Sequence, residues 1–138
     1  MTLTLLDRSN YLKGLLILMG RDRIIHPRER EHILRACRIL DFETRFCTAA
    51  IDDLLRNRHI THDPVIFSER HIAECFLRDG IRLSLIDNEI HPHEFAWLKG
   101  VALANGLSEE WLALERQRFL ERGNSRSDSD RFAIQQYL

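Results

Sequence analysis

The amino-acid sequence predicts an all-α protein: a compact bundle of six to seven helices built from two pseudo-repeated three-helix halves. Apolar residues recur at helical spacing along most of the chain, whereas Pro, Gly and runs of β-branched residues are few. The eight-residue pattern D-x-x-I-H-P-x-E occurs twice, starting at residues 22 and 87. The 138 residues are about one domain and suffice to bury a core, so we expect a single domain over residues 1–138.

The first half is predicted to hold three helices. The first spans about residues 9–21 and is apolar on nearly every side. The second begins at Pro27, because proline is favoured at the first helical position, where its missing N–H costs nothing. The third spans about residues 43–56, with apolar residues one turn apart. Together they place the first half at about residues 9–57.

The second half follows a polar loop, NRHITHDP, at residues 57–64. The fourth helix is expected over about residues 68–86. The fifth, about residues 92–105, begins at a proline and ends before a glycine, which readily adopts the left-handed conformation that closes helices. The sixth spans about residues 108–122 and completes a half at about residues 68–122.

The C-terminal tail, residues 123–138, is predicted to be less ordered. The stretch NSRSDSD is typical of a polar linker. Residues 131–138 are expected to form either a short last helix or a loose tail.

The two halves correspond when the chain is shifted by 65 residues. Beyond the repeated motif, Phe42 then meets Leu107 and Phe46 meets Trp111, all on apolar faces. Two such units usually bury each other's apolar faces about a pseudo-two-fold axis. That packing would bring the two D-x-x-I-H-P-x-E turns to comparable places.

The repeated motif is explained in part as a helix start. Glu29 and Glu94 fall at the third helical position, where a carboxylate can accept from the N-cap N–H and meets the positive end of the helix dipole. Asp22 and Asp87, by contrast, follow the end of a helix, where a negative charge costs some tenths of a kcal/mol to about 1 kcal/mol. A carboxylate repeated at such a place indicates a partner: loop N–H groups, a neighbouring Arg or a cation.

The motif also has the spacing of the last eight positions of a calcium-binding EF-hand loop. One copy alone lacks side-chain oxygens at the first two ligand positions, and the turn glycine is replaced by Arg23 or Asn88. Two copies brought together could pool their carboxylates around a hard divalent cation, Ca²⁺ or Mg²⁺ rather than Zn²⁺. The candidate ligands are Asp22, Glu29, Asp87, Glu89 and Glu94. Helix caps and loop braces without metal are the alternative.

The order of features resembles the TerB-like family, named for tellurite resistance. That family carries an A-D-G-x-I-x-x-x-E turn in each half, a D-P-x-x-F segment before the fourth helix and a G-L-S-x-E segment before the sixth. This chain has DPVIFSE at 63–69 and GLSEEW at 106–111, and the similarity covers about residues 10–120. The resemblance implies a metal-binding helical domain linked to stress response, often within larger assemblies. The positions that carry over are Asp22, Glu29, Asp87 and Glu94.

Other chemistry is not indicated. No nucleophile–base set, Gly-rich phosphate loop or metalloprotease motif occurs, so we predict that the protein is not an enzyme. The histidines, such as those of the pair His59 and His62, lack cysteines at zinc-finger spacing. The net charge is −1 and Arg residues are interleaved with acids, a pattern typical of a solvated helix face, so we predict no nucleic-acid partner. The second hypothesis is therefore a metal-free helical module that binds a protein partner or a second copy.

The location is predicted from the cysteines and the N-terminus. The cysteine number is odd, and Cys37, Cys47 and Cys75 each lie in an apolar helical pattern, which predicts buried thiols in a reducing compartment. The N-terminal apolar run is interrupted by Lys13, follows no basic segment and is far shorter than a membrane span. We therefore expect a cytoplasmic protein without membrane insertion.

Overall fold

The computed structural model describes residues 3–20, 27–56, 62–85, 90–122 and 132–138. Within these ranges the chain is helical and holds no strand, which confirms the predicted fold class. The helices are α1 (Leu5–Met19), α2 (Pro27–Ile39), α3 (Thr44–Arg56), α4 (Arg70–Ser84), α5 (Pro92–Ala104) and α6 (Glu109–Arg122), followed by a 3₁₀ helix, η1 (Ala133–Tyr137). No helix among the described residues is both long and apolar enough to cross a membrane.

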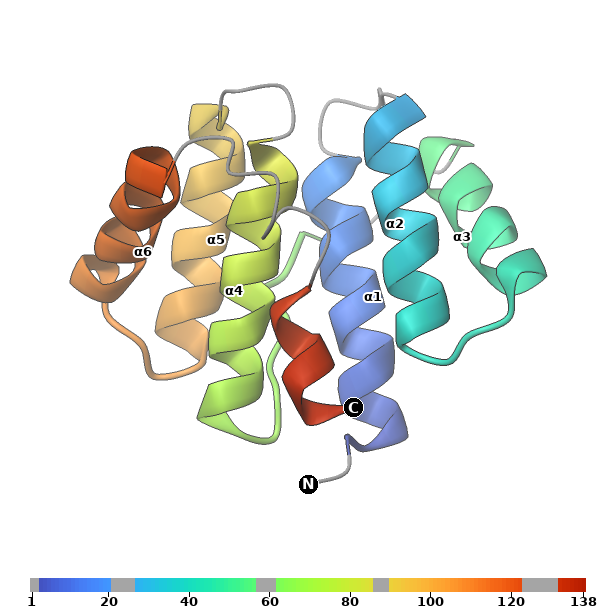
Figure 1. Cartoon of the computed structure of the whole chain (residues 1–138), viewed down its shortest axis with the longest axis horizontal. Coiled ribbons are helices and arrows are strands. Elements are labelled where there is room, and N and C mark those ends of the chain that lie inside the picture. Colours follow the sequence, from blue (N-terminus) through green and yellow to red (C-terminus); the bar gives the residue numbers. More distant parts are fainter. Residues whose placement is uncertain (1–2, 21–26, 57–61, 86–89, 123–131) are drawn as a thin grey trace.

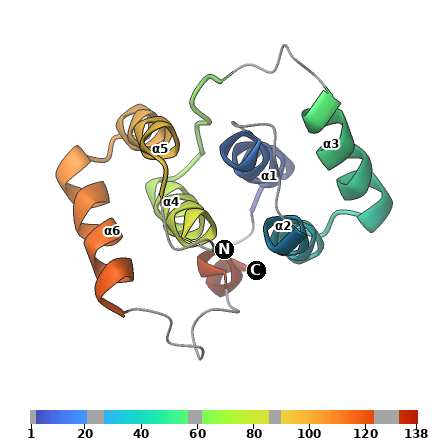
Figure 2. The same cartoon turned by 90° about the horizontal axis from the view of Figure 1, so that it is seen from above.

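Two groups of three helices meet along α1 and α4. Helices α1, α2 and α3 contact one another, as do α4, α5 and α6, and α1 packs on α4 between them. Figures 1 and 2 show α1 and α4 at the centre, with α3 and α6 at the outer edges. The division into two three-helix groups is as expected, whereas their origin as copies of one unit stays a prediction.

Helix α1 starts earlier than predicted and is buried along most of its length. It begins at Leu5 because the Thr4 side chain caps it, with its Oγ1 accepting a hydrogen bond of 3.0 Å from the Asp7 N–H. Lys13 is exposed, and the apolar residues around it are buried. These are Tyr11, Leu12, Leu15, Leu16, Ile17, Leu18 and Met19. Because α1 packs against α2, α3 and α4, apolar residues are buried on several of its sides, and the helix has no continuous polar face.

The chain that leads from the first three helices to α4 is held by side-chain hydrogen bonds. Asn105, at the end of α5, accepts from the Phe67 N–H and donates to the Val65 carbonyl, both at 2.9 Å. Asp7 of α1 accepts from the Ser68 N–H at 2.9 Å and from its hydroxyl at 2.5 Å. These bonds connect the chain before α4 to α1 and to the end of α5, and so link the two groups of helices.

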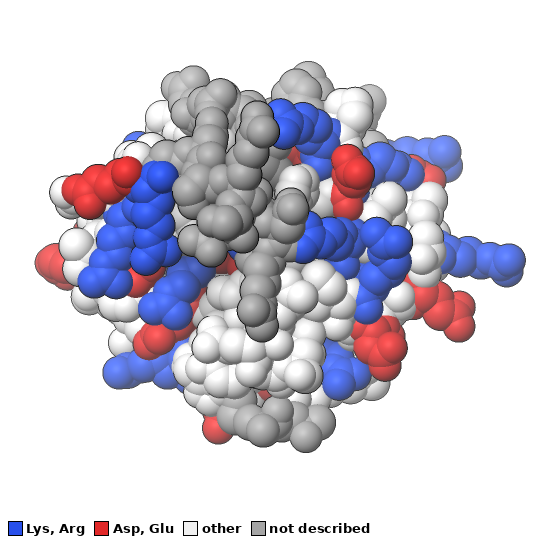
Figure 3. All heavy atoms as spheres, viewed as in Figure 1, with Lys and Arg blue, Asp and Glu red and all other residues white. Residues whose placement is uncertain are grey.

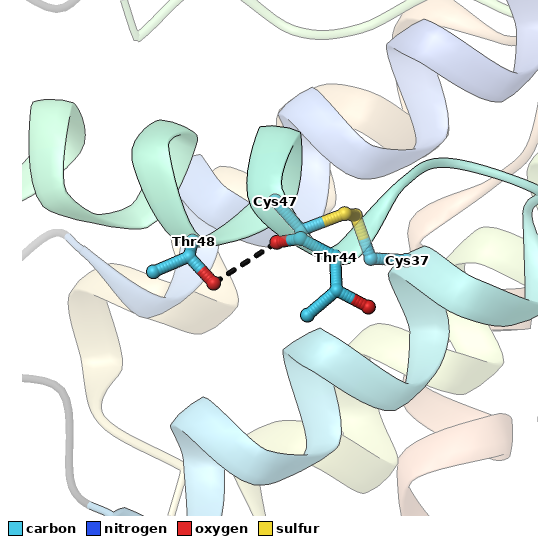
Figure 4. The surroundings of a disulfide bond; sticks show 4 residues. All are labelled: Cys37, Thr44, Cys47 and Thr48. Carbon is cyan, nitrogen blue, oxygen red and sulfur yellow. Dashed lines mark hydrogen bonds between the residues drawn. A yellow bond between two sulfur atoms is a disulfide. The ribbon is translucent and has the colours of Figure 1, made fainter.

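The state of two cysteines differs from the prediction. Cys37 and Cys47 are buried, as expected, but they form a disulfide between α2 and α3 (Figure 4). The prediction of free thiols is therefore wrong for this pair, because helical periodicity places both side chains in one interface without indicating that they meet. Closing a loop of this length stabilises a fold by about 2–3 kcal/mol in the chain-entropy treatment. The cytoplasmic location, inferred in part from free thiols, stays a prediction.

Gly14 in α1 and Gly100 in α5 give a matched test of how tightly the centre is packed. A Cβ at Gly14 would lie 2.5 Å from Cζ of Phe76, whose ring is buried among other aromatic rings, whereas a Cβ at Gly100 would meet only Cγ of Pro64, at 3.6 Å. Alanine in a helix interior is favoured over glycine by about 0.5–1 kcal/mol. We expect Gly100→Ala to raise the free energy of unfolding by up to that amount and Gly14→Ala to lower it by about 1–3 kcal/mol. Urea unfolding of the two variants would measure this, and a stabilised Gly14→Ala variant would contradict the packing described.

Candidate binding groove and predicted metal site

Two of the five predicted metal ligands, Glu29 and Glu94, lie within the described residues. Asp22, Asp87 and Glu89 lie outside the described residues. Glu29 is half-buried in the first turn of α2, and Glu94 is buried in the first turn of α5. Among the residues that the structure does describe, no group of three or more His, Cys, Asp and Glu side chains is suited to a metal ion. The pooled carboxylate site stays a prediction.

The structure does show what Glu94 does locally. Its Oε1 accepts a hydrogen bond of 3.1 Å from the His91 N–H, which is the glutamate half of a capping box at the start of α5. The cap interpretation of the motif is thus confirmed for the second copy. In Figure 1 the C-terminal ends of α1 and α4 and the N-terminal ends of α2 and α5 lie at the same end of the bundle. The helix ends that border the two motifs therefore share one end of the molecule.

A different site is occupied by the end of the chain itself. The segment 132–138, which includes η1, lies along α4 on the side of α1 and α2 (Figures 1 and 2). Its Phe132 and Ile134 side chains are 5% and 1% exposed. We call the surface that receives this segment the tail groove. The side chains that contact the segment come from α2 and α4: Arg35, His71, Cys75, Asp79 and Arg82.

Asp79 is the polar anchor of the tail groove. This residue is 1% exposed, and its Oδ1 accepts a hydrogen bond of 2.6 Å from the Ala133 N–H. Its Oδ2 accepts from the Ile134 N–H at 3.3 Å and from the Tyr11 hydroxyl. One carboxylate of α4 therefore joins α1 to the first turn of η1, where free backbone N–H groups favour a negative charge.

The protonation of this cluster follows from its burial. Burial raises the pKa of Asp79 from 3.8 to about 6, against the hydrogen bonds from Tyr11, Ala133 and Ile134, which lower it. Burial and the neighbouring Asp79 raise the pKa of Tyr11 well above its ordinary value. The tyrosine therefore stays protonated and donates. Near neutral pH, Asp79 is largely ionised and accepts from all three donors.

Further contacts hold the rest of the segment. The Gln136 amide donates to the Cys75 sulfur over 3.5 Å, and the Tyr137 ring packs on His71 with a centroid distance of 4.7 Å. Burial raises the pKa of Cys75 to about 11, so this cysteine is a protonated thiol and unsuited to nucleophilic chemistry. The prediction of a buried free thiol is confirmed for Cys75.

Positive charge lies where the segment enters the tail groove. The guanidinium carbons of Arg35 and Arg82 lie 5.5 Å and 5.8 Å from the centre of the Phe132 ring, a cation–π arrangement from two helices. The pKa of His32 is lowered by burial first and then by Arg35 and Arg82. The two arginines are thus close enough to this histidine to disfavour a further positive charge.

The sequence itself carries a signal for this site. Asp79 lies at helical spacing from Phe76 and Leu83, within the apolar stripe predicted for the fourth helix, where a charged residue needs a buried partner. Phe132 and Ile134 are likewise apolar residues in a tail that is otherwise mostly polar. A buried acid together with an apolar tail is the pattern that indicates a docked segment.

Comparisons with known proteins do not assign this site or the chain. No family model, no curated protein and no solved structure matches the sequence or the fold. The resemblance to the TerB-like family therefore stays a prediction that depends on the residues quoted for it.

The raised pKa of Asp79 predicts how stability changes with pH. The folded chain binds this proton more tightly than the unfolded chain, so the stabilisation is complete below about pH 4 and is lost as the pH rises through about 6. We expect a loss of about 3 kcal/mol in the free energy of unfolding from this group over that range, and Asp79→Asn should lack it. Denaturant unfolding of both proteins between pH 4 and pH 7 would measure the difference.

Asp7 provides the control. Its pKa is lowered by hydrogen bonds from Ser68 and Thr4, which outweigh burial, so its stabilisation is present above about pH 4 and is lost in acid. The Asp7→Asn variant should therefore keep the decline between pH 4 and pH 6. Parallel curves for wild type and Asp79→Asn would show that Asp79 is not the group responsible.

Proposed function

We propose that this chain is a non-catalytic helical interaction module whose binding site is the tail groove, with its own segment 132–138 as the resident ligand. The observation that carries the proposal is the pair of backbone hydrogen bonds from Ala133 and Ile134 to the buried Asp79. Backbone recognition of this kind does not depend on the side chains at those two positions. It suits a site that receives a segment of chain rather than a fixed core element.

The energetics of Asp79 explain why the tail groove requires an occupant. A carboxylate taken out of water is costly unless hydrogen-bond donors replace the lost water. Two of its three donors belong to the segment, and the third is Tyr11. The residues that join α6 to the segment, GNSRSDSDR, include no large apolar side chain, so the apolar burial of the tail comes from residues 132–138. Another segment with the same features could take its place.

The test uses the full chain with its tail groove vacated. Ile134→Asp places a charge at a buried position of the segment and should release it from the groove. A fluorescent peptide of residues 127–138, with the natural isoleucine, should bind this variant by fluorescence anisotropy. Wild type should bind the peptide at least about tenfold more weakly, because its own tail competes at a high effective concentration.

Leu138→Asp is the matched control, since this tail residue is exposed and the resident segment should remain in place. That variant should resemble wild type in its weak binding of the peptide. If Ile134→Asp keeps the helical circular dichroism of wild type and binds no peptide, the tail groove is not a binding site.

A second candidate function is the binding of a divalent cation, as the TerB-like resemblance implies. The observation that favours it is the shared end of the bundle at which α1 and α4 end and α2 and α5 begin (Figure 1). Carboxylates of the two motifs would supply oxygen ligands for Ca²⁺ or Mg²⁺ there. In this proposal the chain is a metal-responsive module linked to stress response or tellurite resistance.

Thermal unfolding during titration with Ca²⁺, Mg²⁺, Mn²⁺ and Zn²⁺ tests the cation proposal. A cation that binds only the folded chain should raise the unfolding midpoint as its concentration increases. The double variant Asp22→Asn/Asp87→Asn should lose the shift, whereas Asp53→Asn, an exposed acid of α3, should keep it. The absence of a shift in wild type, or an equal shift in the double variant, would reject the site.

A further inference from the structure

The corner between α2 and α3 is closed by the disulfide of Cys37 and Cys47 (Figure 4). Both cysteines are buried, at 0% and 1% exposed, and their Cα atoms lie 6.2 Å apart. The bond joins residues that are 10 positions apart, so it encloses the turn between the two helices and the first turn of α3. It is the covalent part of the contact between α2 and α3.

The first half of α3 buries little besides its cysteine. Among residues 44–50, whose exposure the structure describes throughout, Cys47 is the single buried side chain, and Ala50 is partly buried. Phe46 is 54% exposed and stacks on the partly buried Phe42 of the turn, with the ring centres 5.5 Å apart. The disulfide is therefore the main side-chain contact that fastens this half of α3 to α2.

The turn that leads into α3 adds little to this attachment. Asp41 has a φ of 68°, in the left-handed region that residues with a side chain seldom occupy, although Asp tolerates it better than most. Its carboxylate lies 3.9 Å from the Arg8 guanidinium, but the Asp41 side chain is 89% exposed, so water screens the pair. Backbone hydrogen bonds of 3.0 Å join the Asp41 and Phe42 N–H groups to the carbonyls of Arg38 and Cys37. These bonds fix the path of the turn without burying it.

The second half of α3 is held independently of the disulfide. Ile51 is 0% exposed, and Asp52 forms an ion pair of 3.5 Å with Arg30 of α2. Figure 3 shows side chains of both charges interspersed on the side of the molecule where α2 and α3 lie, as expected of a surface in contact with water. Movement of residues 41–50 would therefore leave the attachment of α3 at Ile51 in place.

From this arrangement we infer that the α2–α3 corner is a redox switch: residues 41–50 are closed on α2 when Cys37 and Cys47 form the disulfide, and they open when a dithiol reduces it. The first thiolate of the dithiol attacks one sulfur, forms a mixed disulfide and releases the other cysteine. The second thiol then displaces the first cysteine. Two electrons and two protons pass to the cysteine sulfurs, and the dithiol leaves as a disulfide. The switch is separate from the residues that line the tail groove and does not depend on the proposed function.

The route of reduction follows from the packing. Because both sulfur atoms are buried, the dithiol reaches them only after part of the chain has moved. A disulfide in a firmly packed core waits for the whole fold to open, whereas one beneath a loosely packed segment becomes accessible by local opening. The first half of α3 is of the second kind. The reduction rate should therefore depend little on urea below the unfolding transition, because local opening exposes little surface.

Amide hydrogen exchange of the full chain, measured by mass spectrometry in the oxidised and the dithiothreitol-reduced states, tests the switch. We expect the amides of residues 42–50 to exchange about thirtyfold to a hundredfold faster after reduction. That factor is the change in an opening equilibrium when a loop closure of this length is lost. The amides of α4 and α5 lie outside the closed loop and should change by less than about twofold.

Two variants separate the disulfide from other effects of the reductant. Cys37→Ala with Cys47→Ala removes the bond, so this chain should exchange as reduced wild type does and should not respond to dithiothreitol. Cys75→Ala is the matched control, because Cys75 is a buried cysteine outside the disulfide. This control variant should respond to the reductant as wild type does. If the double variant does not fold, reduced wild type provides the same comparison.

Several results would overturn the redox switch. Equal exchange of residues 42–50 in the two states is one, and exchange that is faster by the same factor in every helix is another, since a bond that stabilises only the whole fold would give it. Loss of the helical circular dichroism on reduction would count equally against it. So would a reduction rate that rises with urea as steeply as global unfolding does, or failure of the chain to form the Cys37–Cys47 bond with oxidised glutathione.

Discussion

The arrangement of the described chain depends on the carboxylate of Asp79, which is buried between α1, α4 and the C-terminal segment. Tyr11 and the backbone of Ala133 and Ile134 supply its donors. Because these groups come from elements far apart in the sequence, one side chain fixes the position of the last segment relative to both central helices. The ring of Tyr11, whose hydroxyl donates to Asp79, packs edge-on against the ring of Phe76, with the ring centres 5.3 Å apart.

The sequence was a good guide to elements and a poorer guide to contacts. Pro27 and Pro92 marked two helix starts correctly, and the buried stripe of the fourth helix was visible in Ile72 and Phe76. These features are local, because they depend on spacing and backbone chemistry within one or two turns. The start of α1 was placed too late because the Thr4 cap precedes two exposed leucines that do not follow the apolar pattern.

The contacts that were missed are those between distant residues. The Cys37–Cys47 disulfide requires the relative placement of α2 and α3, and the tail groove requires that α4 and residues 132–138 meet. The apolar period of a single helix does not indicate which other segments of the chain that helix contacts. For the metal site, the sequence predicted a local role for Glu94 that the structure confirms, whereas the pooling of two motifs depends on Asp22 and Asp87, which lie outside the described residues.

Two buried acids, Asp7 and Asp79, have opposite pKa shifts. Asp7 has a lowered pKa, because its hydrogen bonds outweigh its burial, and so it stabilises the fold when ionised. Asp79 has a raised pKa in spite of three donors, so its ionised form lowers stability near neutral pH. If the C-terminal segment served only to complete the core, an apolar residue of similar size at position 79 would avoid this cost. Under the proposed interaction function, the stability cost of Asp79 is explained by recognition of the terminal segment, since sites that reduce stability are often those that carry function.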